Sequence, residues 1–161
     1  MSPDARSDAF VYRERLSPSL RVLVASALCA PMVALVLTPV DTTVALAAGA
    51  VAAVLIIAGL VAASPRIRVE DGVLYAGRAH IDVGLLGDPV ALVSEDARNA
   101  RGRDLDPRSW TVVRGGIDGV LVVPIADAED PAPNWIISSR TPDRLAAALR
   151  RARARPSTPR R

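Results

Sequence analysis

Residues 22–64 read VLVASALCAPMVALVLTPVDTTVALAAGAVAAVLIIAGLVAAS, and Asp41 is the sole charged side chain among these 43 residues. The other 36 charged residues of the 161-residue chain lie outside this block. An apolar run of about 18 residues or more is long enough to cross the hydrocarbon layer of a bilayer as a helix. The block holds two such runs, so it predicts two transmembrane helices.

The position of Asp41 predicts how the two helices are connected. A carboxylate at the centre of a bilayer costs about 2.5–3.5 kcal/mol, whereas a carboxylate at a turn stays in water. Pro39 disfavours continued helix before it, and Asp41 is suited to cap the helix that follows. We therefore predict a two-helix transmembrane hairpin over residues 21–64, with spans at about 22–40 and 43–64. Pro31 is expected to kink the first span.

Two other interpretations of this block were weighed. Residues 21–47 resemble a secretory signal with cleavage after Ala47, but their apolar run exceeds the usual 7–15 residues or so and a second run follows directly. A helical pair buried in a soluble protein requires polar faces, which neither segment has. The small residues Ala45, Gly49 and Ala53 allow close helix packing, either within the hairpin or in a homo-oligomer.

Arginines flank the block on both sides, whereas the connection at Asp41 has no basic residue. Those before it are Arg13, Arg15 and Arg21, and those after it are Arg66 and Arg68. Cytoplasmic flanks of membrane helices collect basic residues. This pattern predicts a multi-pass inner-membrane protein with both termini in the cytoplasm, including an N-terminal segment at residues 1–20.

The net charge of +3 is unevenly distributed, and all 20 basic residues are arginine. Residues 66–144 carry a net charge of −3, whereas residues 145–161 carry +6. The basicity belongs to the C-terminal end, without aromatic residues between the arginines, so no nucleic-acid partner is predicted. Residues 154–161 are predicted to be a disordered basic tail. The candidates for contact with anionic lipid head groups are Arg150, Arg151, Arg153 and Arg155. The alternative is that these arginines form a solvated helix end.

From residue 65 the apolar runs shorten to strand length and turn residues separate them. The predicted strands are 66–70, 73–76, 79–82, 90–93, 110–114, 120–125 and 134–139. Asp71-Gly72 and the loop 115–119 are predicted hairpin turns. A short helix is expected from an N-cap at Ser94 to about Gly102.

The clearest local pattern is a C-terminal helix that starts at Pro142 with Thr141 as its cap. Its apolar stripe, expected to pack on the sheet, is Leu145, Ala148, Leu149 and Ala152. The sequence therefore predicts a small α+β cytoplasmic domain over residues 65–153. About seven antiparallel strands and a C-terminal helix give it an element order similar to pleckstrin-homology-like domains, which implies no ligand.

Few residues are candidates for chemistry. The acidic residues that suit a divalent cation or an acid/base pair are Asp104, Asp106, Asp127 and Asp130, with Glu129 beside them. Asp-Pro steps also start turns, which is the alternative interpretation. His80 and Cys29 are the sole His and Cys, so one chain cannot assemble a zinc site or a Cys-His pair from them. No cofactor is predicted.

Three segments carry a resemblance to a known family. They are Tyr12-Arg13-Glu14-Arg15-Leu16, Asp104-Leu105-Asp106-Pro107, and the run from Asp130 to Pro142 (DPAPNWIISSRTP). Together they resemble domain-of-unknown-function family 3093, which comprises actinobacterial two-span membrane proteins, over roughly residues 10–150. The chain departs from the family pattern at residues 17–20, where the family tends to have tryptophans, and at Asn134, where it tends to have an aromatic. The resemblance implies an integral membrane protein of unassigned activity.

The function predicted from the sequence is a membrane-tethered scaffold or interaction module without catalytic activity, whose partners are the lipid bilayer and an unidentified protein. The alternative is a carboxylate-dependent metal or ligand binder, or an enzyme, at the membrane surface. Two spans without a charged residue inside them form no transport pathway unless they oligomerise.

Overall fold

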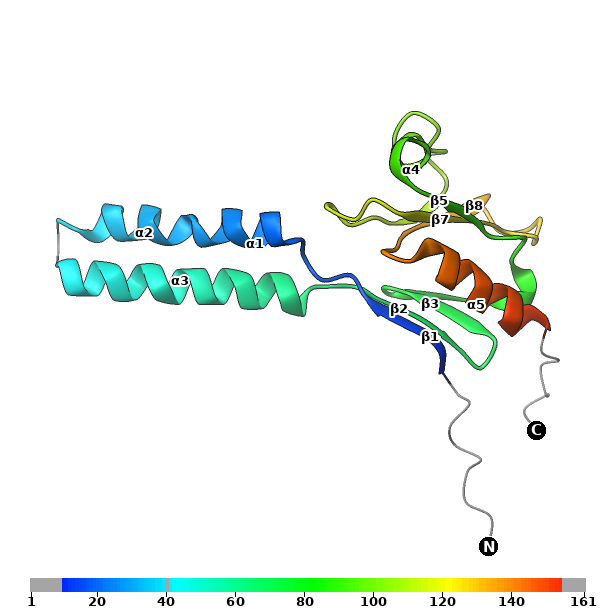
Figure 1. The fold of residues 1–161 in the computed structure, drawn as a ribbon, viewed down its shortest axis with the longest axis horizontal. Coiled ribbons are helices and arrows are strands. Elements are labelled where there is room, and N and C mark those ends of the chain that lie inside the picture. The colour runs from blue at the N-terminus through cyan, green and yellow to red at the C-terminus, as the bar shows by residue number, and fades with distance from the viewer. Residues whose placement is uncertain (1–9, 40, 155–161) are drawn as a thin grey trace, which may run out of the picture. The chain divides into compact units, whose positions relative to one another are not determined.

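The computed structural model describes residues 10–39 and 41–154, which form two compact units (Figure 1). The helical unit comprises Ser17–Ser64. The β-rich unit combines the segment that ends at Leu16 with the chain from Pro65 onward. The helical unit is therefore inserted in sequence between the first strand and the rest of the β-rich unit. The predicted tail beyond residue 154 lies outside the described residues.

The helical unit is a hairpin of three helices, α1 (Leu20–Ala27), α2 (Cys29–Leu37) and α3 (Thr42–Ala62). The first predicted span is interrupted at Leu28, three residues before Pro31. Pro31 has no N–H to donate to the carbonyl of Ala27, and its ring crowds that carbonyl. This loss explains why the span divides into α1 and α2.

Side-chain caps begin both arms of the hairpin. The carboxylate of Asp41 accepts a hydrogen bond from the backbone N–H of Val44 at 2.8 Å, as predicted. The hydroxyl of Ser19 accepts one from the N–H of Val22 at 3.4 Å. The lone acid of the apolar block thus satisfies a backbone group that the first turn of α3 leaves unpaired.

The two arms of the hairpin meet through small residues. The buried residues of α3 are Ala45 and Gly49. A Cβ atom placed on Gly49 would lie 2.6 Å from the carbonyl oxygen of Ala30 and 3.3 Å from the Cβ of Ala34. The backbones of α2 and α3, side by side in Figure 1, therefore approach more closely than a side chain larger than hydrogen allows.

This close approach predicts that Gly49→Ala destabilises the hairpin by about 2 kcal/mol, because overpacking a tight contact typically costs 1–3 kcal/mol. Gly59→Ala is the matched control, since the same helix has nothing within 4 Å of a Cβ placed there. Both variants are measured in mixed micelles by the loss of helical circular dichroism with added SDS. Equal midpoints for the two variants would contradict the close approach at Gly49.

The first sheet of the β-rich unit is antiparallel, in the order β1-β2-β3-β4. Its strands are β1 (Phe10–Arg15), β2 (Arg66–Glu70), β3 (Val73–Ala76) and β4 (Ala79–Asp82). Asp71 and Gly72 join β2 to β3 with φ of 50° and 76°, so both residues have the positive φ of the predicted type I′ turn. β1 was not predicted, because its partner β2 follows the whole helical unit in the chain.

The second sheet differs from the prediction. Its order is β5-β7-β8-β6, formed by β5 (Val90–Leu92), β6 (Trp110–Val112), β7 (Val120–Pro124) and β8 (Asn134–Ser138). The predicted hairpin between 110–114 and 120–125 is wrong, because β8 lies between these strands and pairs in parallel with β6. The description of about seven antiparallel strands is likewise corrected, since the described residues form two four-stranded sheets with one parallel pair. β7 and β8 take the two central places, and four of the five residues of β8 are buried.

The C-terminal helix α5 (Pro142–Ala154) lies between the two sheets in Figure 1. Its predicted apolar stripe is confirmed, as Leu145, Ala148, Leu149 and Ala152 are all buried. The main core contains residues of both sheets and of α5, for example Val69, Leu121 and Leu145. The similarity in element order to pleckstrin-homology-like domains stays a prediction.

A smaller core lies on the other face of the second sheet, beneath α4 (Ser94–Arg101). It contains Ala97 of α4 with Val120 and Ile136 of the sheet. Ser94 is not the N-cap that the sequence predicted, because Val93 takes that position and no side chain caps this helix. Because side chains alternate along a strand, β7 and β8 contribute to both cores.

Candidate functional site

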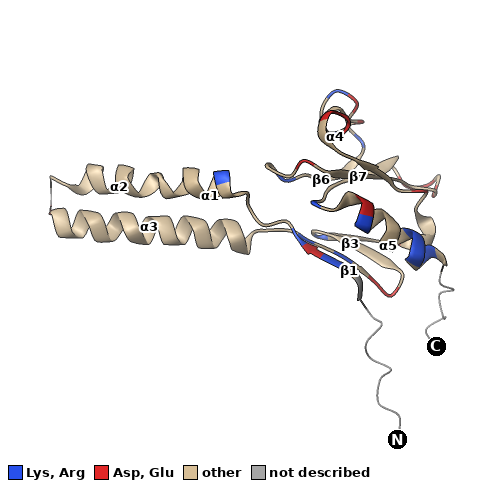
Figure 2. Cartoon of the chain, in the orientation of Figure 1, with Lys and Arg blue, Asp and Glu red and all other residues tan. Residues whose placement is uncertain are grey.

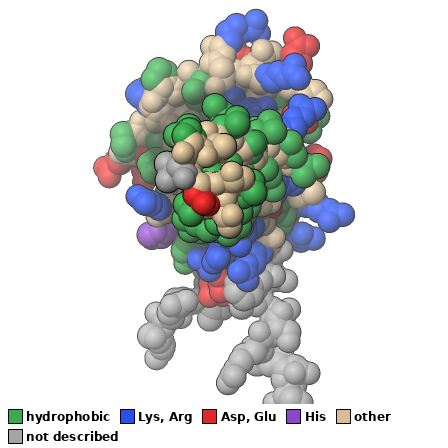
Figure 3. Space-filling model, turned by 90° about the vertical axis from the view of Figure 1, so that its left-hand side faces the viewer, with side chains coloured by type: hydrophobic (Ala, Val, Ile, Leu, Met, Phe, Trp, Pro, Cys, Tyr) green, Lys and Arg blue, Asp and Glu red, His purple; other side chains and the backbone are tan. Residues whose placement is uncertain are grey.

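The outer surface of the helical unit is apolar. No residue of α1 or α2 is buried, and α2 and α3 carry no charged residue (Figure 2). Large apolar side chains more than half exposed are Leu20, Val24, Leu28, Met32, Leu35, Val36, Val44, Leu46, Val51, Val54 and Leu55. Figure 3 looks onto the end of the hairpin and shows hydrophobic side chains gathered over it. A surface of this kind marks a site for a membrane or a protein partner.

Both arms have the length and composition of membrane spans. Leu20–Leu37 comprises 18 residues and Thr42–Ala62 comprises 21 residues. Buried residues make up none of the first span and 11% of the most apolar window of the second. The described residues thus contain two helices long and apolar enough to cross a membrane.

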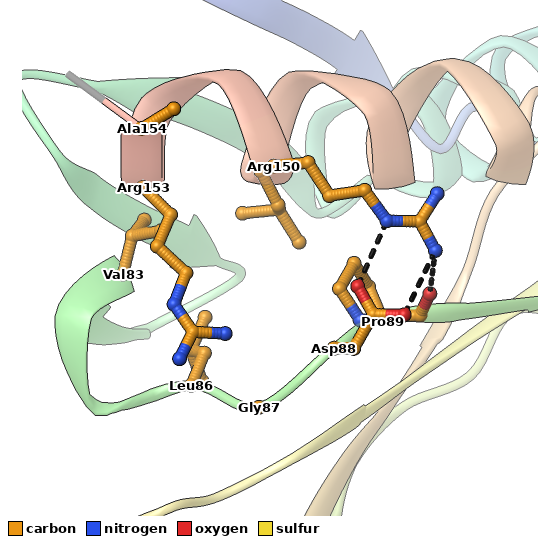
Figure 4. Close-up of a pocket in the computed structure, with 9 residues that line it drawn as sticks. Val83, Leu86, Gly87, Asp88, Pro89, Arg150, Arg153 and Ala154 are labelled. Atoms are coloured by element: carbon orange, nitrogen blue, oxygen red, sulfur yellow. Dashed lines mark hydrogen bonds and ion pairs between the residues drawn. The ribbon is translucent and has the colours of Figure 1, made fainter.

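Arg150, the first of the predicted lipid-contacting arginines, is engaged within the β-rich unit. Its guanidinium donates to both carboxylate oxygens of Asp88, at 2.8 and 3.2 Å, and to the carbonyl of Pro89 at 2.8 Å (Figure 4). The hydrogen bond from Arg150 holds the pKa of Asp88 below its usual range and raises the pKa of Arg150. Arg150 thereby ties α5 to the loop that precedes β5.

The other three arginines differ in their surroundings. Arg153 lines a cavity of about 260 Å³ together with Arg150, and its side chain extends from α5 toward Leu86 in Figure 4. Arg151 is exposed on α5. Arg155 lies outside the described residues. The structure therefore places Arg150 and Arg153 at one cavity and leaves Arg151 on the exposed surface.

Three of the four candidate acidic residues stabilise turns by local hydrogen bonds. Asp106 accepts hydrogen bonds from the backbone and side chain of Arg108, and these bonds lower the pKa of Asp106. Asp127 and Asp130 each accept a hydrogen bond from the backbone N–H two residues further along the chain. This is the local bonding by which aspartates stabilise turns.

Asp104 is exposed, and the guanidinium of Arg103 lies 3.4 Å from its carboxylate. Within residues 10–39 and 41–154, no three His, Cys, Asp or Glu side chains are grouped so as to hold a metal ion. His80 stacks on Tyr75 at the surface of the first sheet, with ring centroids 5.7 Å apart. Cys29 begins α2 in the hairpin.

Sequence reasoning missed a polar cluster that joins the two ends of the β-rich unit. Glu14 of β1 accepts hydrogen bonds from the hydroxyls of Tyr12 at 2.7 Å and Ser139 at 2.6 Å, and from the backbone N–H of Arg140 at 2.8 Å. The Tyr12 hydroxyl also lies 2.9 Å from that of Thr141. We call Tyr12, Glu14, Ser139 and Thr141 the polar clamp.

The polar clamp joins two of the three segments that carry the family resemblance, Tyr12–Leu16 and Asp130–Pro142. The family resemblance that both segments carry is the sequence signal that relates them. Ser139 is fully buried and its oxygen also accepts the N–H of Thr141 at 3.1 Å. A buried hydroxyl with its hydrogen bonds satisfied is a structural group, not a nucleophile open to substrate. The clamp therefore fastens β1 to the start of α5.

The clamp predicts a pH dependence at the alkaline end. Burial, and then the hydrogen bond to Glu14, raise the pKa of Tyr12 above its usual value of 10.0. The neutral phenol is thus favoured in the folded state, so its contribution to stability is complete below about pH 10 and is lost as pH rises through the raised pKa. We expect phenolate absorbance of Tyr12, measured in Tyr75→Phe, to develop above pH 10 and together with loss of folding. Ionisation of Tyr12 below pH 10 in the folded protein would contradict this.

The family model described as "Protein of unknown function (DUF3093)" matches residues 11–149, which is most of the chain. Neither the curated proteins nor the solved structures contain a match.

Proposed function

We propose that this chain, which belongs to the DUF3093 family of proteins of unknown function, is an integral membrane protein whose hairpin tethers the β-rich unit as a scaffold or interaction module. The observation that carries the proposal is the apolar surface of the hairpin, where large side chains such as Leu35 and Val36 are more than 70% exposed. Exposure of this apolar surface to water costs free energy, whereas contact with the hydrocarbon of a bilayer removes that cost.

The dimensions of the hairpin support this proposal. At roughly 1.5 Å per residue, spans of 18 and 21 residues are about 27 and 31 Å long, close to the ~30 Å hydrocarbon thickness. Helix formation pairs the backbone groups inside the spans, as a bilayer requires, apart from those at the helix ends and near Pro31. Asp41 caps α3 at the turn, where its carboxylate stays in the aqueous layer.

The arginine distribution supports an orientation with both termini in the cytoplasm. Arg15 and Arg66 are paired across β1 and β2, and Arg68 follows two residues later. The connection between α2 and α3 contains no basic residue. Positive residues remain on the cytoplasmic side during insertion. The β-rich unit is then cytoplasmic, and Arg151 and Arg153 are available to anionic head groups at the inner membrane surface.

The β-rich unit is suited to hold the two ends of its membrane anchor together. The N–H of Leu16, just before the helical unit, donates to the carbonyl of Pro65, just after it, at 3.0 Å. The β1–β2 pairing continues from this bond along five paired positions. A protein that binds the β-rich unit is therefore held at the membrane by the anchor. This tethering is the role that we assign to the β-rich unit. Self-association through the hairpin is part of the same proposal.

The proposal is tested by fractionating cells that express the full chain. We expect it to remain with membranes after washing with alkaline carbonate and to be released by detergent. Cysteine-labelling reporters at Asp41 and at Ser64 in a Cys29→Ala background should be modified from outside the cell at Asp41 alone. Release by carbonate as a monodisperse protein would overturn membrane insertion, and labelling at Ser64 alone would overturn the orientation.

A further inference from the structure

Four arginines lie together at one end of the first sheet, on the face turned away from the core. The buried residues of β2 alternate with Arg66 and Arg68, which therefore lie on the outer face. Across β1 and β2, Arg13 stands opposite Arg68 and Arg15 stands opposite Arg66. Two pairs of like charges are thus neighbours on adjacent strands. We call Arg13, Arg15, Arg66 and Arg68 the arginine patch.

The carboxylates of the sheet do not neutralise this patch. Like charges directly opposite each other on a sheet repel and are destabilising. Arg68 lies 3.8 Å from the carboxylate of Glu70. Arg13 and Arg66 are exposed, and neither forms an ion pair with another of the described residues. An anion from outside the chain would therefore relieve a repulsion that the fold itself leaves in place.

An aromatic row continues from the patch across the sheet. Arg13, Arg68, Tyr75 and His80 are in register over all four strands. The guanidinium carbon of Arg68 lies 5.0 Å from the centroid of the Tyr75 ring, on which His80 also stacks. Contact with the ring restricts the Arg68 side chain, so less conformational entropy is lost when its planar guanidinium binds an anion.

The opposite end of the same face is acidic. Glu70 and Asp82 are in register with Val73 between them, and Asp71 is in the turn that follows β2. At about 3.3 Å per residue, Glu70 is about 13 Å from Arg66 along β2. Figure 2 shows arginines on β1 and acidic residues at the turn between β2 and β3. A long polyanion laid along the strands would meet these carboxylates, whereas a flat anionic surface at the arginine end avoids them.

The arginine patch is close to the hairpin in the chain on both sides. Arg15 precedes Ser17 by two residues, and Arg66 follows Ser64 by two residues. Because a chain extends by at most about 3.6 Å per residue, an inserted hairpin keeps both arginines within reach of lipid head groups. Guanidinium groups bind phosphate through two parallel hydrogen bonds.

We propose that the arginine patch binds the phosphate groups of anionic phospholipids and holds this end of the first sheet against the membrane surface. The inference rests on the proposed insertion of the hairpin, and it adds the class of lipid and the residues that bind it. These residues belong to β1 and β2, and the arginines of α5 are not among them.

The test measures lipid binding to the full chain in uncharged dodecyl maltoside micelles by native mass spectrometry. We expect phosphatidylglycerol to bind at least about tenfold more tightly than phosphatidylcholine with the same acyl chains. The double variant Arg13→Gln/Arg66→Gln should lose about tenfold or more of its affinity for phosphatidylglycerol. The control Arg98→Gln/Arg103→Gln removes the same charge from exposed positions in α4 and in the turn after it, and it should leave binding unchanged.

A second measurement separates lipid binding from a structural role. Since Arg13 and Arg66 each stand opposite a like charge, the double variant Arg13→Gln/Arg66→Gln should have a urea midpoint without lipid at least as high as that of the unmodified chain. Added phosphatidylglycerol should raise the midpoint of the unmodified chain more than that of the variant. A lower midpoint of the variant without lipid would assign the two arginines to folding and overturn the proposal.

Three further results would also overturn it. They are equal affinities for the two lipids, equal losses in the two double variants, and binding of an oligothymidylate as tight as that of phosphatidylglycerol. Insertion is tested separately, by carbonate washing of vesicles made of phosphatidylcholine alone. Release from these vesicles contradicts the proposed function, whereas retention together with equal affinities for the two lipids contradicts the arginine patch alone.

Discussion

Replacing Glu14 by alanine is expected to lower the free energy of unfolding of the β-rich unit by about 3 kcal/mol. Glu14 accepts three hydrogen bonds, from Tyr12, Ser139 and Arg140. Its loss removes the acceptor of the fully buried Ser139 hydroxyl and one acceptor of the half-buried Tyr12 hydroxyl, which keeps the Thr141 hydroxyl 2.9 Å away. An unsatisfied buried donor costs about 1–3 kcal/mol. Because Glu14 is only part-buried, we expect the combined cost for the two hydroxyls to lie near the lower end of the range for two such donors.

The measurement is urea unfolding of the full chain in micelles, followed by tryptophan fluorescence. Both tryptophans, Trp110 and Trp135, lie in the β-rich unit, so the signal reports that unit alone. Glu129→Ala is the control, because Glu129 lies on an exposed loop, and it should change stability by less than about 0.5 kcal/mol. A loss in Glu14→Ala no greater than in Glu129→Ala would show that the polar clamp does not hold β1.

Gly119→Ala is expected to destabilise the same unit by about 2–4 kcal/mol. A Cβ atom on Gly119 would lie 2.5 Å from the carbonyl oxygen of Ser139 and 2.9 Å from the Cδ of Pro142. Neither neighbour is free to move, because Ser139 belongs to the polar clamp and Pro142 is a buried residue at the start of α5. Overpacking against backbone of this kind typically costs 1–3 kcal/mol, and more where the neighbours are fixed.

Gly115→Ala is the matched control within the same loop. A Cβ atom on Gly115 has nothing within 4 Å, and its φ is not positive. Gly115→Ala should therefore be neutral, or stabilising by up to about 1 kcal/mol through the unfolded chain. Both variants are compared in the same fluorescence-detected urea titration. Similar midpoints would refute the close approach between this loop and the start of α5.

Most local patterns were read correctly, because they depend on residues close together in sequence, and the N-cap predicted at Ser94 is an exception. The Asp71-Gly72 turn, the Asp41 cap and the apolar stripe of α5 all depend on residues within one or two turns of each other. Backbone sterics and side-chain periodicity are sufficient for such features. The same reasoning divided the chain into an apolar and a strand-rich part.

Pairings between distant segments were not accessible in the same way. Phe10–Arg15 is a strand because Arg66–Glu70 lies beside it, and no local feature of the N-terminal segment indicates this. The adjacency of 110–114 and 120–125 in sequence favoured a hairpin, but the strongly buried β8 lies between them. Burial of apolar area in the centre of a sheet outweighs the short loop.

The candidate sites show the same division. The sequence identified the arginines of α5 as charged candidates, yet the Asp88 partner of Arg150 emerged only when strands and helices were placed. The polar clamp likewise requires Glu14 and Ser139, which are separated by 125 residues. Hydrogen bonds between such segments follow from tertiary packing.

The sequence by itself determined that 43 almost uncharged residues form a helical hairpin of two arms turned at Asp41, because apolar length and one carboxylate are properties of the chain alone. The tertiary structure alone decided that the strand before the hairpin pairs with the strand after it, and that Glu14 is held by Ser139 and Arg140. These features depend on which distant surfaces pack together, and that is decided by the summed burial and hydrogen bonding of the whole unit.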